Sequence, residues 1–286
     1  MSEAVQELYE VARQFLLGMA FMLTWCVRCV AYDEQLSAKE LVDQAILAQV
    51  AAQNDTSRFE YLQRQLEKRD TKTYRVVESD AGSVQRTIAI DGRELAPQQR
   101  EHEQEWLDKL LANPSIQKNR QKEDADEDAR RQKLIVVLGK AFLYEIEGIE
   151  NDGQIVRLRF RPNPKFHADS REAKVCAGLE GTMRIDRVKQ RFMRAEGTLI
   201  RGVDFGWGVF GHLNKGGHFA IEQTQVDPGV WRITGLDLDF KGSMLIVKSL
   251  KIRVREHSFN FRRVPDHLSL KDAVEMLRRE YPSMAY

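Results

Sequence analysis

Between residues 141 and 262 the chain alternates apolar and charged side chains in one short segment after another. In Gln154–Arg161, for example, Val156, Leu158 and Phe160 alternate with two arginines. The pattern recurs in four further segments, which are Ala141–Ile149, Thr182–Asp186, Gly235–Phe240 and Lys248–Arg255. Because successive side chains of a strand point to opposite faces, we predict an antiparallel sheet with one apolar and one solvated face. Helices or a ligand must cover the apolar face, and which of them does so is the functional question.

The first part of the chain predicts one helix and three more strands. Ser37-Ala38-Lys39-Glu40 has the sequence of a capping box, and the helix that it opens is expected to end near Gln53. Asp80-Ala81-Gly82 and Asp91-Gly92 are typical turn sequences. They delimit three expected strands, Arg58–Arg69, Thr73–Ser79 and Ser83–Ile90.

Two more helical regions are expected. Pro97 begins a charged region of about residues 97–140, in which the run Gln117–Lys133 is interpreted as a solvated helix face or a mobile insertion. Near the other end, Ser269–Glu280 predicts a short amphipathic helix capped by Ser269. Its inward residues are expected to be Ala273, Val274 and Leu277.

Phe15–Ala31 is the one strongly apolar stretch without alternation. It is short for a membrane span, contains Arg28, and has the length of a signal-peptide core. We therefore expect export and cleavage after Ala31, which leaves residues 32–286 as a single mature domain. The preceding Met1–Gln14 is acidic where a signal peptide is normally basic, so a misassigned start or an uncleaved N-terminal anchor are the alternatives.

The sequence contains no set of residues in a spacing that is typical of an enzyme active site. Gly206–Gly211 matches G-x-G-x-x-G, but turn-rich sequence and a strand follow it instead of a helix. The six histidines show no recognised ligand spacing, so neither a metal nor a cofactor is expected. Cys26 and Cys29 form a W-C-x-x-C match inside the expected leader, which we interpret as coincidence, and Cys176 is expected to be a small buried hydrophobe.

Five segments carry a resemblance to a known family. A strand reading G-x-x-x-I-D followed by one with R-x-E-G resembles the outer-membrane lipoprotein-sorting (LolA/LolB-like) superfamily, in its uncharacterised exported bacterial subset. The resemblance covers about Arg58 to Arg262. The segments that carry it are Phe160–Phe166, Gly181–Asp186, Arg194–Gly197, Val203–Gly217 and Phe219–Gln223.

The resemblance implies a β-rich α+β fold, with a single curved antiparallel sheet forming an incomplete barrel and helices covering its concave face. Members of the family shield acyl chains of lipoproteins or glycolipids in the periplasm, others are stress sensors that bind a partner, and one is a biosynthetic enzyme. The charged region 97–140 is a departure from the smaller carriers.

We therefore expect a non-catalytic carrier of a lipid or lipoprotein acyl chain, with a periplasmic or outer-membrane protein as a second partner. The alternative is a structural or sensory module whose own helices fill the cavity, and a third possibility is an enzyme of the same fold with a hydrophobic substrate. The formal net charge of +1 gives no reason to expect a nucleic-acid partner. The residues expected to bind ligand alternate with polar neighbours on their strands, with Trp207 and Trp231 at the rim of the surface. They are Leu158, Phe160, Met183, Ile185, Leu238, Phe240 and Ile252.

Overall fold

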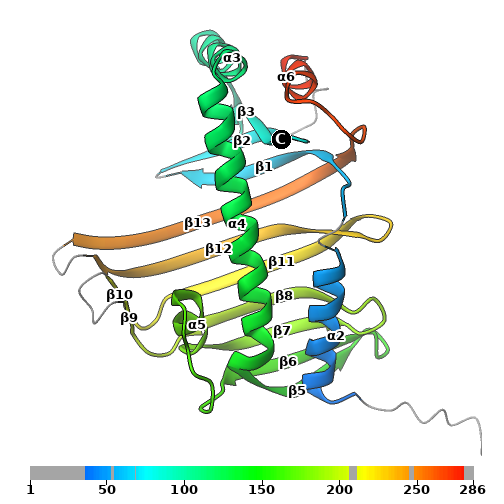
Figure 1. Ribbon diagram of the computed structural model, residues 1–286, viewed down its shortest axis with the longest axis vertical. Helices are drawn as coiled ribbons and strands as arrows, with labels where there is room; N and C mark the ends of the chain where they lie inside the picture. The colour runs from blue at the N-terminus through cyan, green and yellow to red at the C-terminus, as the bar shows by residue number, and fades with distance from the viewer. Residues whose placement is uncertain (1–35, 53–54, 68, 206–210, 245–247, 280–286) are drawn as a thin grey trace, which may run out of the picture. The chain divides into compact units, whose positions relative to one another are not determined.

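The computed structural model describes residues 36–52, 55–67, 69–205, 211–244 and 248–279 (Figure 1). Residues from Ala38 onward belong to one compact unit. The expected leader, residues 1–31, lies outside the described residues. Within the described part of the chain, no helix combines the length and the apolar character needed to cross a membrane.

The described residues contain one antiparallel sheet of 13 strands, as the alternation predicts. The strand order is β4-β3-β2-β1-β13-β12-β11-β8-β7-β6-β5, and β10 joins β9 to β12 beside this path. The two end strands of the order do not pair with each other, so the sheet is not closed into a barrel. The strands are β1 (Phe59–Glu67), β2 (Asp70–Ser79), β3 (Gly82–Ile90), β4 (Arg93–Glu94), β5 (Phe142–Glu150), β6 (Ile155–Pro162), β7 (Leu179–Asp186), β8 (Arg191–Leu199), β9 (Val203–Phe205), β10 (Gly211–Leu213), β11 (His218–Asp227), β12 (Val230–Met244) and β13 (Lys248–Arg263).

The two faces of the sheet differ as the sequence predicts. On β6, Val156, Leu158 and Phe160 are buried, while the arginines between them are exposed. The solvated face carries ion pairs between neighbouring strands, such as Arg255 with Asp237 at 3.1 Å. Ile146 on β5 is an exception, because it is 45% exposed on an edge strand that has a bulge next to it.

Five helices are described: α2 (Ala38–Ala51), α3 (Pro97–Ala112), α4 (Pro114–Ala141), α5 (Arg171–Cys176) and α6 (Leu270–Arg278). The expected helical region 97–140 is divided in two at Asn113, whose backbone is extended because a proline follows it. The Asn113 side chain then accepts the backbone N–H of Ser115 and caps α4. Ser269 caps α6 as predicted, accepting the backbone N–H of Asp272 at 3.2 Å.

The helices build a separate core at each end of the strand order. At the β3 end, α3 and α6 pack on β2 and β3, and Ala273, Val274 and Leu277 are buried there as predicted. At the β5 end, α2 contacts β5, β7 and β8. Helix α4 contacts strands at both ends, β3 and β5, and it therefore crosses the central strands (Figure 1).

Close packing of β7 against β8 explains why Gly181 and Gly197 are glycines. Gly181 of β7 lies opposite Gly197 of β8, and a Cβ atom at Gly181 would be 2.0 Å from the carbonyl oxygen of Glu196. Phe160 and Phe219 on the flanking strands are in the same row, with ring centroids 6.4 Å apart. The glycine pair thus allows a close strand approach, and aromatic rings flank the position where side chains are missing.

Candidate ligand-binding cavity

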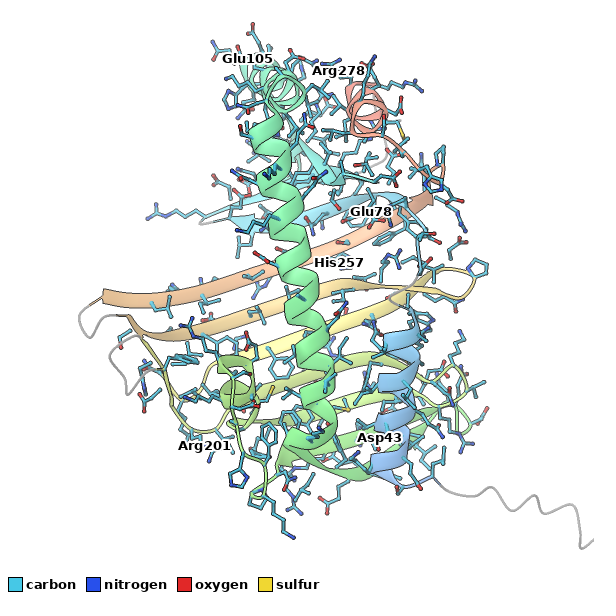
Figure 2. The ribbon with its side chains drawn as sticks, viewed as in Figure 1. Asp43, Glu78, Glu105, Arg201, His257 and Arg278 are labelled. Atoms are coloured by element: carbon cyan, nitrogen blue, oxygen red, sulfur yellow. The ribbon has the colours of Figure 1, made fainter. Side chains whose placement is uncertain are left out.

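A cavity of about 880 Å³ lies over the central strands of the sheet. Its walls come from β1, β2, β3, β11, β12 and β13, with Leu134 of α4 and Glu172 of α5 completing it. Figure 2 shows α4 passing in front of these strands, with Glu78 of β2 and His257 of β13 labelled in this region. The cavity therefore extends from β3, near one end of the strand order, to β11 in its middle, and none of its lining residues comes from β5 to β8.

Part of the cavity lining is apolar. Ile221, Ile233 and Leu236 contribute aliphatic side chains from β11 and β12, and Ile233 is 39% exposed. The rings of Tyr61 and Phe261 stack with centroids 4.7 Å apart. Aliphatic and aromatic surface with incomplete burial is the surface that an apolar ligand would cover.

Another part of the lining is polar, although it lies on the face that is apolar at the β6 end. On β13, Glu256 and Ser258 continue the inward row that begins with Leu250, and Gln63 of β1 lies opposite Ser258. The Gln63 amide donates to the Glu256 carboxylate at 3.5 Å. This part of the lining can therefore contact water or the polar part of a ligand.

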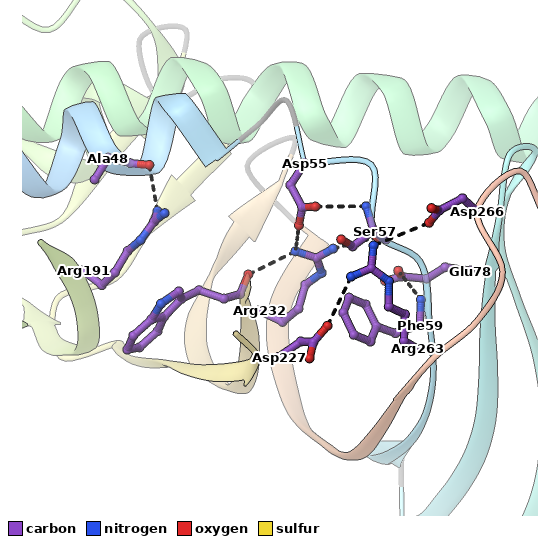
Figure 3. Close-up of polar contacts among 11 residues, drawn as sticks. Ala48, Asp55, Ser57, Phe59, Glu78, Arg191, Asp227, Arg232, Arg263 and Asp266 are labelled. Atoms are coloured by element: carbon purple, nitrogen blue, oxygen red, sulfur yellow. Dashed lines mark hydrogen bonds and ion pairs between the residues drawn. The ribbon is translucent and has the colours of Figure 1, made fainter. Parts of the chain in front are cut away.

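An arginine network fixes the end of the cavity next to β1 (Figure 3). Arg232 donates to the Asp55 carboxylate at 3.0 Å and to the carbonyl oxygen of Ser57 at 2.9 Å, and its guanidinium lies 5.1 Å from the ring centre of Phe59. Burial alone would raise the pKa of Asp55, but the hydrogen bonds from Ser57 and the Arg232 charge lower it overall. Arg232 therefore ties the segment before β1 to β12.

Glu78 is a half-buried carboxyl group in this region. It accepts the backbone N–H of Phe59 at 3.0 Å and lines the cavity. Burial raises the pKa of Glu78, and the nearby charge of Arg232, the Phe59 amide and the charge of Arg58 offset only part of that rise. The neutral form of Glu78 is accordingly more accessible than that of a solvated glutamate.

The expected ligand-binding residues lie elsewhere on the same face. Leu158, Phe160, Met183 and Ile185 are at most 3% exposed, so they form packed core at the β5 end. The register puts Phe160 and Leu238 in one row across five strands, and pairs Phe240 with Ile252. Leu238 and Ile252 are half-buried, Phe240 is buried, and Lys189 lies over the ring of half-buried Trp231. Trp207 lies outside the described residues.

None of the expected residues that the structure describes lines the cavity. Leu236 belongs to the same alternating segment as Leu238 and Phe240, so alternation was sufficient to find it. Gln63, Glu256 and Ser258 are polar residues in inward positions, and no sequence pattern distinguishes them from solvated ones.

Cys176 has the buried position that the sequence predicts. It is 2% exposed, and burial raises the pKa of its thiol to about 11. A thiol with a raised pKa is a weak nucleophile, so this cysteine contributes packing to the fold. In the ranges that the structure describes, no three His, Cys, Asp or Glu side chains are arranged to hold a metal ion.

No family model matches the chain, and no curated protein or solved structure matches it either. The function proposed for the chain therefore depends on the geometry of the cavity and on the chemistry of its lining.

Proposed function

We propose that the chain is a non-catalytic carrier that binds a lipid or a lipoprotein acyl chain in the cavity over the central strands. The observation that supports this function is the cavity itself. Its volume of about 880 Å³ falls in the range of about 300–1,000 Å³ that is typical of small-molecule sites. Aliphatic side chains at Ile221, Ile233 and Leu236 provide the surface for an acyl chain.

The hydrophobic effect supplies the affinity in this proposal. Fully covering a Leu or Ile side chain contributes about 1.5–3 kcal/mol, so three such contacts are enough for a reversible complex. In the proposed fold the sheet is a curved half-barrel, with α4 over its concave side and the acyl chain between them. The polar lining at Gln63 and Ser258 would contact the headgroup or water.

The proposed location is the periplasm, and it follows from the apolar stretch Phe15–Ala31 and the family-like strand motifs. In that compartment a carrier would receive its ligand from one membrane and deliver it to a periplasmic or outer-membrane protein. An uncleaved N-terminal segment would instead hold the same cavity at a membrane surface.

A structural or sensory interaction module is the second candidate function. The observation that favours it is the complete burial of Leu158 and Ile185 at the β5 end, where α2 packs on the sheet. In that alternative the protein's own helices fill the apolar face and a partner protein binds outside. An enzyme of the same fold with a hydrophobic substrate is the third.

Mass spectrometry of bound lipid tests the proposal. The protein is purified from its native periplasm without detergent, extracted with organic solvent, and compared with a Leu236→Glu variant prepared in the same way. The carrier function predicts a lipid that co-purifies with the wild type and is depleted from the variant. Equal, trace lipid in both preparations would contradict it and favour the interaction module.

A further inference from the structure

We infer that the cavity selects amphipathic ligands with an anionic headgroup, a carboxylate or a phosphate, and that Arg58 binds that group. The inference rests on the proposed function, because it assigns the headgroup chemistry of the ligand held in the same cavity. Arg58 immediately precedes β1 and lines the cavity together with Tyr61 and Gln63.

Arg58 has a donor that the protein leaves unused. Its Nε–H is buried and has no hydrogen-bond acceptor among the described residues. Its backbone is held in place, since the carbonyl oxygen of Arg58 accepts the N–H of Val264 at 3.0 Å. Buried polar groups are nearly always hydrogen-bonded in folded proteins, so an acceptor on a ligand in the cavity would satisfy a donor that the protein does not.

Arg232, the other arginine of the lining, differs from Arg58 in that its side chain is hydrogen-bonded within the protein. Arg232 donates to the Asp55 carboxylate and to the carbonyl oxygens of Ser57 and Trp231 (Figure 3). These hydrogen bonds connect β12 to the segment before β1. Of the two arginines that line the cavity, Arg58 is thus the one with donor capacity for a ligand.

Three of the four acidic groups of the lining have partners in the protein. Glu78 accepts the Phe59 N–H, Glu256 accepts the Gln63 amide, and the Asp80 carboxylate lies 3.6 Å from His267. The charge of Arg58 lowers the pKa of Glu78, so Glu78 is the carboxylate of the protein with which a ligand anion would share Arg58. Glu172 comes from α5, a different element from the strands around Arg58.

Guanidinium geometry sets the ligand class. An arginine presents parallel N–H donors that match the two oxygens of a carboxylate or phosphate, and such charge-assisted bonds are stronger than neutral ones. Ile221 and Leu236 line the same cavity and would take the apolar tail. A single-tailed fatty acid and a phosphate-bearing lipid share this chemistry.

Displacement of a neutral dye measures the selectivity directly. Nile red is bound to the full chain and displaced with hexadecanol, hexadecanoate or hexadecyl phosphate. We expect the anionic ligands to bind about tenfold more tightly than the alcohol, as one charge-assisted contact implies. Stronger binding of hexadecanoate would indicate a fatty acid as the source, and stronger binding of hexadecyl phosphate a phospholipid headgroup.

The same titrations on Arg58→Gln should give equal affinities for all three ligands, with the affinity for hexadecanol unchanged. Arg64→Gln is the matched control, because Arg64 is an exposed residue of β1 outside the cavity lining, and it should keep the wild-type selectivity. Equal affinities in the wild type would overturn the headgroup inference while leaving the carrier function intact. That comparison needs no variant, so it decides the inference even if Arg58→Gln does not fold. Failure of all three ligands to bind the wild type would instead contradict the proposed function.

Discussion

Single residues decide where this sheet is packed and where it is open. Leu158 and Ile185 are fully buried on the apolar face of the β5 end. Gln63, Glu256 and Ser258 lie on the corresponding face of the central strands and line the cavity. Polar side chains in these positions favour an open cavity, because a polar group beside solvent costs less free energy than one in an apolar core.

The ion pair between Glu60 and Arg75 tests how strongly a buried charge depends on its partner, because both side chains are less than 10% exposed. Arg75 also donates to the carbonyl oxygen of Arg279 at 2.7 Å. We expect Arg75→Ala to lower the free energy of unfolding by about 3–5 kcal/mol, since it leaves the Glu60 carboxylate buried without its cation. Urea denaturation measures this loss.

Arg255→Ala is the matched control for that experiment. Arg255 pairs with Asp237 on the solvated face, where removal of a pair costs less than about 1 kcal/mol. A loss of similar size in both variants would show that Glu60 and Arg75 do not depend on each other in the folded protein.

Glu78 should make stability depend on pH. Because burial raises its pKa above the ordinary value of 4.5, the folded state binds a proton that the unfolded state releases. The contribution of Glu78 is therefore fully present below the ordinary pKa and is lost as pH rises through the folded-state pKa. Glu78→Gln keeps an acceptor for the Phe59 N–H without ionising, so its stability relative to the wild type should increase from pH 4 to pH 7. Urea denaturation of both proteins across this range measures the difference, and a constant difference would contradict the assignment.

At the scale of elements, α4 determines how the two ends of the sheet are connected. It contacts α3 and β3 near one end and α2, α5 and β5 near the other. The contact with α2 is close at Gly139, where a Cβ atom would be 3.3 Å from Cδ1 of Ile46 and 3.6 Å from the Asp43 carboxylate. Gly139 thus allows α2 and α4 to approach each other closely, although glycine has a lower helix propensity than alanine.

Gly139→Leu tests this helix contact. Overpacking against Ile46 should lower the free energy of unfolding by about 1–3 kcal/mol, because the larger side chain has to push α2 away from α4. Val136→Leu is the control on the same helix, since Val136 is 55% exposed and its change should stay within about 0.5 kcal/mol. Equal stability of Gly139→Leu and the wild type, measured by urea denaturation, would show that α2 and α4 do not depend on this close approach.

The alternation of apolar and polar residues predicted much of the sheet, and the predicted strand in β13 ends where that alternation ends. The expected strand Lys248–Arg255 continues in the structure to Arg263. Its inward positions change from apolar to polar at Glu256, and a polar inward residue has no signature in an alternating pattern. The predicted strand therefore ends eight residues early, where β13 passes the cavity.

At the scale of the whole molecule, local periodicity indicated an apolar face but not which parts of it the helices cover. Leu158 and Leu236 both alternate with polar neighbours, yet the first is core and the second lines a cavity. The difference depends on the path of α4 and the position of α2, which are contacts between residues far apart in the sequence. For this reason the alternation places Leu158 and Leu236 on one face of the sheet but does not distinguish packed core from cavity lining.

The most direct test of the carrier function compares ligand binding and melting temperature in Leu236→Glu. We expect this variant to bind Nile red at least about tenfold more weakly, because a carboxylate in the apolar lining opposes binding of the apolar dye. Its melting temperature should remain close to that of the wild type, since the cavity lets the new charge keep its water. Leu158→Glu should lose its fold because it buries a charge in packed core, and Val188→Glu, at a side chain 74% exposed, should change neither property. A Leu236→Glu variant that unfolds like Leu158→Glu, together with a wild type that binds no dye, would contradict the carrier function.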